Sequence, residues 1–207
     1  MLVLSFNMCY IVCWGVHAKI VIVLHGSRDS EYVDSVRHFA ERVGVLYAFV
    51  SLSRPSVNEA EGDVYIPLFI GYGKDYERAV SITGFETPPV LRWPRIKDFL
   101  ISLGPGLYVF HGDPDPRFLE DTNRLGLRDI AFLKIKPTLR DYMSSRCPGK
   151  VIPVVLTHGV IYREILRTVN ELCPGTEVVR PLFELETFIS YFREKMSWLV
   201  RNTRPVR

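Results

Sequence analysis

Two histidines each follow a short apolar run and each precede a glycine, with an aspartate four positions after the histidine. The stretches are VIVLHGSRD (21–29) and LYVFHGDPD (107–115), with the histidines at His25 and His111. A neutral imidazole binds borderline divalent metals and can accept a proton near neutral pH. Each histidine is therefore a candidate metal ligand or base, although a lone histidine at a strand end is more often a hydrogen-bonded structural residue. The glycines favour tight turns and the close approach of a large ligand.

The two histidine segments belong to a longer internal repeat. His25 and His111 are 86 positions apart (111 − 25), and Pro67 and Pro153 are again 86 apart (153 − 67). Ordered matches at nearly constant offset predict two copies of one unit joined near LGPG (103–106). The further matching segments are 48–57 with 131–139, 64–73 with 150–159, and 90–103 with 178–192.

The repeat has the pattern of an α/β unit in which buried strands alternate with helices. Continuous apolar runs suit strands buried on both faces, and strand–helix alternation implies right-handed crossovers and parallel sheets. We expect a three-layer α/β fold of two similar halves, at 19–103 and 107–200, behind an N-terminal extension at 1–18. Pro67 and Pro153 conflict with strand interiors, so they are expected at strand starts or edges. The strands expected in each half are 20–24 and 107–110, 46–52 and 129–135, and 64–70 and 151–157, followed by a short fourth strand.

Further polar residues are expected where the carboxyl ends of the strands meet. Ligands of open parallel sheets bind beyond those ends. GYGKD (71–75) and THGVIY (157–162) follow the third strand of each half. The sequence therefore predicts His25 beside Asp75, and His111 beside His158, on one rim.

Composition excludes several classes of protein. The 207 residues are 47% hydrophobic, and 26 basic against 23 acidic residues give a formal net charge of +3. This mild excess without blocks of like charge does not indicate nucleic-acid binding. The apolar N-terminus lacks a basic region before the apolar stretch and is short for a membrane span, so an extra strand or covering segment is favoured over a targeting peptide. The four cysteines show no CxxC pair, so reduced thiols in a cytoplasmic protein are expected.

Three segments, in order, resemble the sirohydrochlorin cobaltochelatase family, the small class II chelatases of tetrapyrrole biosynthesis. They are VLHGSRD (23–29), PSVNEA (55–60) and IPLFIGYGKDYERAV (66–80). The resemblance covers 19–103 clearly and 107–195 more faintly. It implies two α/β halves facing across a cleft. It also implies insertion of a divalent metal substrate, Co²⁺ favoured and Ni²⁺ or Fe²⁺ as alternatives, into sirohydrochlorin or a related acidic tetrapyrrole. No organic cofactor, nucleic acid or membrane is expected as a partner.

The resemblance also implies roles for individual residues. His25 would bind the metal and take a proton, and Asp75 stands where the family has a second histidine. A carboxylate can bind a divalent metal and accept a proton, although it is a weaker base than imidazole. The matching position in the second half is Ile161. The residues expected to contact the tetrapyrrole are Ser27, Arg28, Gly73, Lys74 and Arg78, with Arg92 as a further candidate for its carboxylates.

The residue at position 75 leaves alternatives open. The second half could hold the active pair, with His111 and His158 as metal ligands. A second alternative is a non-catalytic protein that binds a tetrapyrrole or metal. A hydrolase using His25 with Ser27 is disfavoured, because the sequence has no G-x-S-x-G segment. A duplicated chain could work as a monomer, whereas short family members pair as homodimers, and both states stay open.

Overall fold

The computed structural model describes residues 18–206. The extension predicted at 1–18, and with it Cys9 and Cys13, lies almost entirely outside these residues. No helix between residues 18 and 206 is both long enough and apolar enough to cross a membrane.

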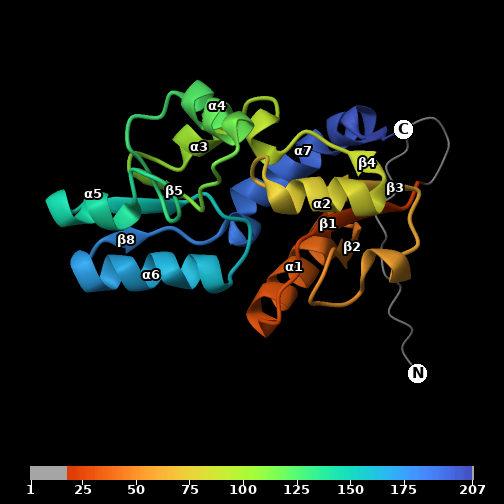
Figure 1. The fold of residues 1–207 in the computed structure, drawn as a ribbon, viewed down its shortest axis with the longest axis horizontal. Coiled ribbons are helices and arrows are strands. Elements are labelled where there is room, and N and C mark those ends of the chain that lie inside the picture. The colour runs from red at the N-terminus through yellow and green to blue at the C-terminus, as the bar shows by residue number, and fades with distance from the viewer. Residues whose placement is uncertain (1–17, 207) are drawn as a thin grey trace.

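The chain forms two α/β halves that lie side by side along the long axis of the molecule (Figure 1). The elements of the first half are β1 (Ile20–Leu24), α1 (Ser30–Val43), β2 (Leu46–Phe49), η1 (Val57–Glu59), β3 (Val64–Pro67), α2 (Lys74–Thr83), β4 (Phe85–Glu86), η2 (Val90–Arg92) and α3 (Ile96–Ser102). Those that follow are β5 (Leu107–Phe110), α4 (Pro116–Leu125), β6 (Ile130–Phe132), α5 (Leu139–Ser145), β7 (Lys150–Pro153), α6 (Val160–Leu172), β8 (Glu177–Val178), η3 (Leu182–Glu184), α7 (Glu186–Asn202) and β9 (Arg204–Pro205).

The two main sheets are parallel and share one strand order. The first sheet runs β2-β1-β3 and the second runs β6-β5-β7-β8. Val23 pairs with Pro67 and Val109 with Pro153, so the same register occurs in both halves. Each proline is the last residue of its strand, so the expectation of a strand start is wrong. Pro67 lies on the edge strand β3, as expected, whereas Pro153 lies on β7 between β5 and β8, beyond the two residues with which β8 pairs. The predicted fold class, two α/β halves with mostly parallel sheets, is confirmed.

The helices that follow β1 and β5 begin at equivalent aspartates. The Asp29 side chain accepts a hydrogen bond from the backbone N–H of Glu31, and the Asp115 side chain accepts one from that of Arg117. Each carboxylate thereby satisfies a donor that the first helical turn leaves unpaired. These caps place the start of each helix directly after the histidine turn.

The fourth strand of the first half differs from the prediction. β8 joins the second sheet beside β7, but β4 pairs antiparallel with β9 and not with the first sheet. The reason is the path of α7, which packs against α1 and β3 of the first half and brings the chain's last residues to β4. Figure 1 shows α7 passing behind the halves toward the first one.

The expectation of reduced thiols is wrong for two of the cysteines. Cys147 and Cys173 form a disulfide in the structure. The bond links the loop before β7 to the end of α6. Cysteines without metal-ligand spacing gave no sequence signal for this pairing, because folding alone brings the two positions together.

Candidate active site

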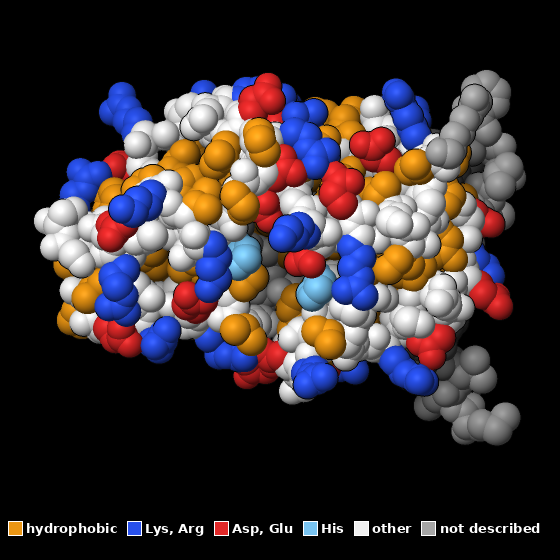
Figure 2. Space-filling view, in the orientation of Figure 1, with side chains coloured by type: hydrophobic (Ala, Val, Ile, Leu, Met, Phe, Trp, Pro, Cys, Tyr) orange, Lys and Arg blue, Asp and Glu red, His pale blue; other side chains and the backbone are white. Residues whose placement is uncertain are grey.

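A cavity of about 520 Å³ lies between the halves, where β1, β3, β5 and β7 end. Loops after these strands and the first turns of α2 and α6 line it. Figure 2 shows the hollow near the middle of one face, with histidine side chains at its edge. This is the position at which parallel sheets place ligands.

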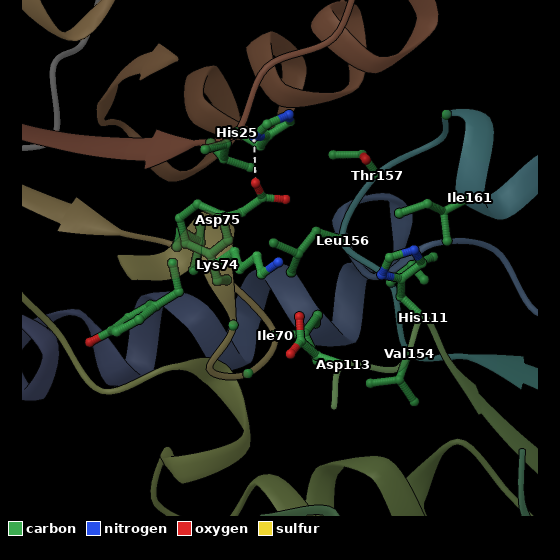
Figure 3. A pocket seen from close by; sticks show the side chains of 18 of the residues that line it. His25, Ile70, Lys74, Asp75, His111, Asp113, Val154, Leu156, Thr157 and Ile161 are labelled. Carbon is green, nitrogen blue, oxygen red and sulfur yellow. Dashed lines mark ion pairs between the residues drawn. The ribbon is translucent and has the colours of Figure 1, made fainter. Parts of the chain in front are cut away.

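His25 and Asp75 face each other at this cavity, as the sequence predicts. His25 follows the last residue of β1, and Asp75 lies in the first turn of α2. His25 Nδ1 lies 3.2 Å from Asp75 Oδ1 (Figure 3). The approach lacks hydrogen-bond geometry, so Nδ1 is a buried polar nitrogen without a hydrogen-bond partner. A buried donor or acceptor without a partner is costly, and a metal or a ligand N–H would satisfy it.

The turn after His25 requires a glycine. Gly26 has a φ of +96°, and a Cβ there would lie 1.8 Å from the backbone oxygen of Ser51. Ser27 also lines the cavity, and its hydroxyl accepts a hydrogen bond from the N–H of Asp29. The HGS sequence thus folds into a turn that fixes the histidine at the cavity wall.

Lys74 and Gly73 form the wall next to Asp75. α2 begins at Lys74 without a side-chain cap, and the Lys74 side chain extends into the cavity (Figure 3). A Cβ on Gly73 would lie 2.4 Å from Asp113 Oδ2, so the glycine lets the two halves approach closely. The other oxygen of Asp113 accepts a hydrogen bond from the N–H of Asp115.

The second half presents a different pair at the matching position. His111 lines the cavity and lies next to Ile161 in Figure 3, whereas His25 lies next to Asp75. Burial, followed by the nearby Lys134, lowers the pKa of His111. His111 is therefore uncharged at neutral pH, because Glu164 of α6 acts in the opposite direction but less strongly than burial and Lys134. The α6 position that matches Asp75 holds Ile161.

His158 does not join His111 at the cavity. Its Nδ1 lies 3.4 Å from Glu184 Oε1, its Nε2 lies 3.9 Å from Glu31 Oε2, and its ring packs edge-on against Tyr162. These contacts belong to a separate groove between α1 and η3. The predicted pairing of His111 with His158 is therefore wrong, because residues 157 and 159 line the cavity while residue 158 turns to the other side.

Two of the basic residues expected to bind the tetrapyrrole lie outside the cavity lining. Arg28 and Arg78 are exposed and do not line it. Arg92 is engaged inside the protein, with its Nε 2.9 Å from Oδ2 of the buried Asp121. Among the predicted tetrapyrrole contacts, the structure thus brings Ser27, Gly73 and Lys74 to the cavity.

Ion pairs between the halves flank the cavity. Arg117 of α4 binds Glu77 of α2, with an Nη2–Oε1 distance of 2.6 Å, and also Asp115. On the other side, Arg163 of α6 binds Asp29 and Glu31. These ion pairs join the first turns of helices from opposite halves, so they link the two walls of the cavity.

Several cavity residues were not predicted from the sequence. Asp113 could have been found, because it aligns with Ser27 in the repeat and follows His111 by two residues. Tyr32 also lines the cavity, and burial raises the pKa of its hydroxyl to about 12, so it stays protonated at neutral pH. No signal marked Tyr32, because one tyrosine on a helix is an ordinary core residue.

The cavity offers a pair of possible metal donors and not a complete set of metal ligands. Among residues 18–206 no three histidine, cysteine, aspartate or glutamate side chains converge in a way that could hold a metal ion. His25 and Asp75 provide one imidazole and one carboxylate, which are donor types that divalent cobalt, nickel and iron accept.

Comparison with known proteins identifies the fold. No family model and no curated protein matches the chain. Among solved structures, the chain is similar to CbiX, described as the terminal enzyme for biosynthesis of siroheme in denitrifying bacteria. The TM-score is 0.63 at 15% sequence identity, over 87% of this chain and 98% of that one. The chain therefore has the fold of CbiX over nearly its whole length.

Proposed function

We propose that the chain is a metal chelatase that inserts a divalent metal ion into an acidic tetrapyrrole. The observation that carries the proposal is the His25–Asp75 pair, with its unsatisfied imidazole nitrogen, facing a cavity between two halves with the fold of CbiX. The family resemblance of the HGSR, PSVNEA and PLF segments supports the same reaction.

The chemistry requires a metal donor and a base in one place. In the reaction M²⁺ replaces two pyrrole N–H protons and forms bonds to the ring nitrogens. An imidazole and a carboxylate 3.2 Å apart can present the metal substrate, accept the released protons and pass them to solvent. Asp75 is suited to that transfer, because its side chain is 59% exposed.

The resemblance provides the first substrates to assay, which are sirohydrochlorin with Co²⁺. Ni²⁺ and Fe²⁺ are the alternatives, and Fe²⁺ also fits the siroheme pathway in which CbiX works. The second candidate function is a non-catalytic tetrapyrrole- or metal-binding protein. The observation favouring it is that Asp75 and Ile161 stand where two histidines would complete the sites.

The test mixes the purified protein with sirohydrochlorin and each metal and follows the absorption change on insertion. We expect a rate above the spontaneous reaction, which His25→Ala lowers by about 10²-fold or more. His158→Ala is the matched control, because that histidine lies in the other groove. A wild-type rate equal to the spontaneous rate with all three metals, together with tight tetrapyrrole binding, would establish the non-catalytic alternative.

A further inference from the structure

The charge of the cavity lining is low for a site that binds a polycarboxylate. Among the described residues that line it, Lys74 is the only cation, and Asp75 and Asp113 are anions. His111 adds no charge at neutral pH, because its pKa is lowered. The lining therefore offers one positive side chain against two negative ones.

Three arginines that flank the cavity are already paired with carboxylates of the protein. Arg92 and Arg117 pack on the ring of Tyr72, a cavity residue, with guanidinium carbons 4.8 and 4.4 Å from the ring centroid. Both are bound to carboxylates of the protein, and so is Arg163 on the opposite wall. A ligand carboxylate would have to break these pairs, and each break leaves a protein carboxylate without its partner.

The rest of the lining is largely apolar and continues to the mouth of the cavity. Val160 and Ile161, at the start of α6, are 61% and 37% exposed. Large apolar side chains open to solvent at a cavity mouth indicate a surface that an apolar ligand covers. The other aliphatic and aromatic side chains of the lining include Leu68, Ile70, Phe118, Val154 and Leu156.

Resting on the proposed function, we propose that the substrate is a tetrapyrrole with few carboxylates and an apolar edge, rather than an octacarboxylate such as sirohydrochlorin. The apolar edge lies on Val160 and Ile161, and the amino group of Lys74 pairs with one carboxylate. The exposed Arg28 and Arg78 outside the lining can bind at most a further one or two. An octacarboxylate would therefore keep most of its charges unpaired beside two aspartates.

Binding of two metal-free porphyrins tests this inference without any insertion chemistry. The probes are mesoporphyrin, with two carboxylates, and uroporphyrin, with eight, each titrated into the wild-type protein at matched ionic strength. We expect a Kd at least about tenfold lower for mesoporphyrin. Equal or tighter binding of uroporphyrin would overturn the inference.

A charge placed at the mouth provides the reciprocal test. Val160→Lys adds a cation to the apolar edge, so we expect the mesoporphyrin preference to fall by about fivefold or more. Ile101→Lys is the matched control, because Ile101 is a 50% exposed helical residue of α3 outside the cavity. Equal shifts in both variants would mean that porphyrins bind the surface non-specifically and would overturn the inference.

Insertion assays with the same macrocycles separate this inference from the proposed function. Tight mesoporphyrin binding without insertion of any metal would contradict the proposed chelatase function, but it would support the inference that the ligand is a tetrapyrrole with few carboxylates. Insertion into sirohydrochlorin or uroporphyrin with a lower KM than into mesoporphyrin would contradict the inferred preference for few carboxylates, but it would support the proposed chelatase function. Failure to bind either porphyrin would contradict the proposed ligand class, and the sirohydrochlorin assay would then test the chelatase by itself.

Discussion

Asp75 and Ile161 occupy matching positions after the third strand of each half, and they give the two histidine turns different chemistry. His25 has a carboxylate beside it, whereas His111 has an aliphatic side chain. The two copies of one unit thus differ in the partner that they place beside the histidine, a carboxylate in the first half and an aliphatic side chain in the second. If the proposed chelatase function holds, we expect the metal and proton chemistry to depend on His25 and Asp75 of the first half.

The carboxylate of Asp75 is expected to act together with His25 in the proposed insertion reaction. Asp75→Asn keeps the shape but removes the proton acceptor and the anionic metal donor, so we expect kcat for insertion to fall by about 10²-fold with little change in KM. Asp75→His restores a donor of the family type and should recover most of the rate. Steady-state insertion kinetics measure both variants.

The control for Asp75 is another aspartate on a helix. Asp98→Asn alters an exposed side chain of α3 that pairs with Arg95, at a site outside the cavity, and should leave kcat unchanged. If Asp75→Asn kept the wild-type kcat, the carboxylate would have no part in insertion.

Gly26, in the turn after His25, is expected to be important for the stability of the fold. Gly26→Ala would place a Cβ 1.8 Å from a backbone oxygen at a φ of +96°, so we expect a loss of at least about 2 kcal/mol in the free energy of unfolding. Gly149→Ala is the control, because a Cβ there meets no atom within 4 Å and its φ is not positive. Equal stability of the two variants in urea unfolding would contradict the strained geometry.

At the scale of elements, the sequence predicts what is encoded by neighbouring residues. The apolar runs at β1 and β5 follow local rules and are found as expected, and the caps at Asp29 and Asp115 follow local rules too. The prolines end their strands, although the sequence suggested strand starts or edges. The pairing of β4 with β9 depends on the path of α7, and the groove that holds His158 depends on the packing of η3 against α1. No local pattern encodes either arrangement. In the candidate site, too, some features follow from neighbouring residues and others depend on contacts between distant parts of the chain. His25 and Asp75 come together because both follow parallel strands, whereas the burial and pairing of the arginines depend on contacts between halves.

The disulfide links the loop before β7 to the end of α6, and its effect on the stability of the fold can be measured. It joins positions 26 residues apart, so in the chain-entropy treatment it stabilises the fold by about 3.5 kcal/mol. We expect a reductant to lower the midpoint of chemical unfolding of the wild type. The Cys147→Ser/Cys173→Ser double variant should unfold at the reduced midpoint with or without reductant. A wild-type midpoint insensitive to reductant would mean that the bond adds no stability.

At the scale of the molecule, the core joins the two halves more closely than the repeat suggests. The rings of Phe39 in α1 and Phe183 in η3 stack with centroids 3.7 Å apart, and Phe188 of α7 packs beside both. One hydrophobic cluster contains buried residues from both sheets and from α7. The cavity walls are therefore fixed relative to each other by a shared core as well as by the ion pairs at its edges.

This shared core predicts that the first repeat does not fold alone. A fragment ending at residue 103 lacks η3, α7 and β9, so it exposes the buried ring of Phe39 and leaves β4 without its partner strand. We expect this fragment to show no cooperative thermal transition, because the lost contacts outweigh the few kcal/mol by which small domains are stable. Co-expression with a fragment starting at residue 104 should restore a cooperative transition and the cavity's porphyrin binding, since the two pieces together contain every contact. A first repeat that unfolds cooperatively by itself, at the temperature of the whole chain, would show that the contacts between the halves add nothing to stability.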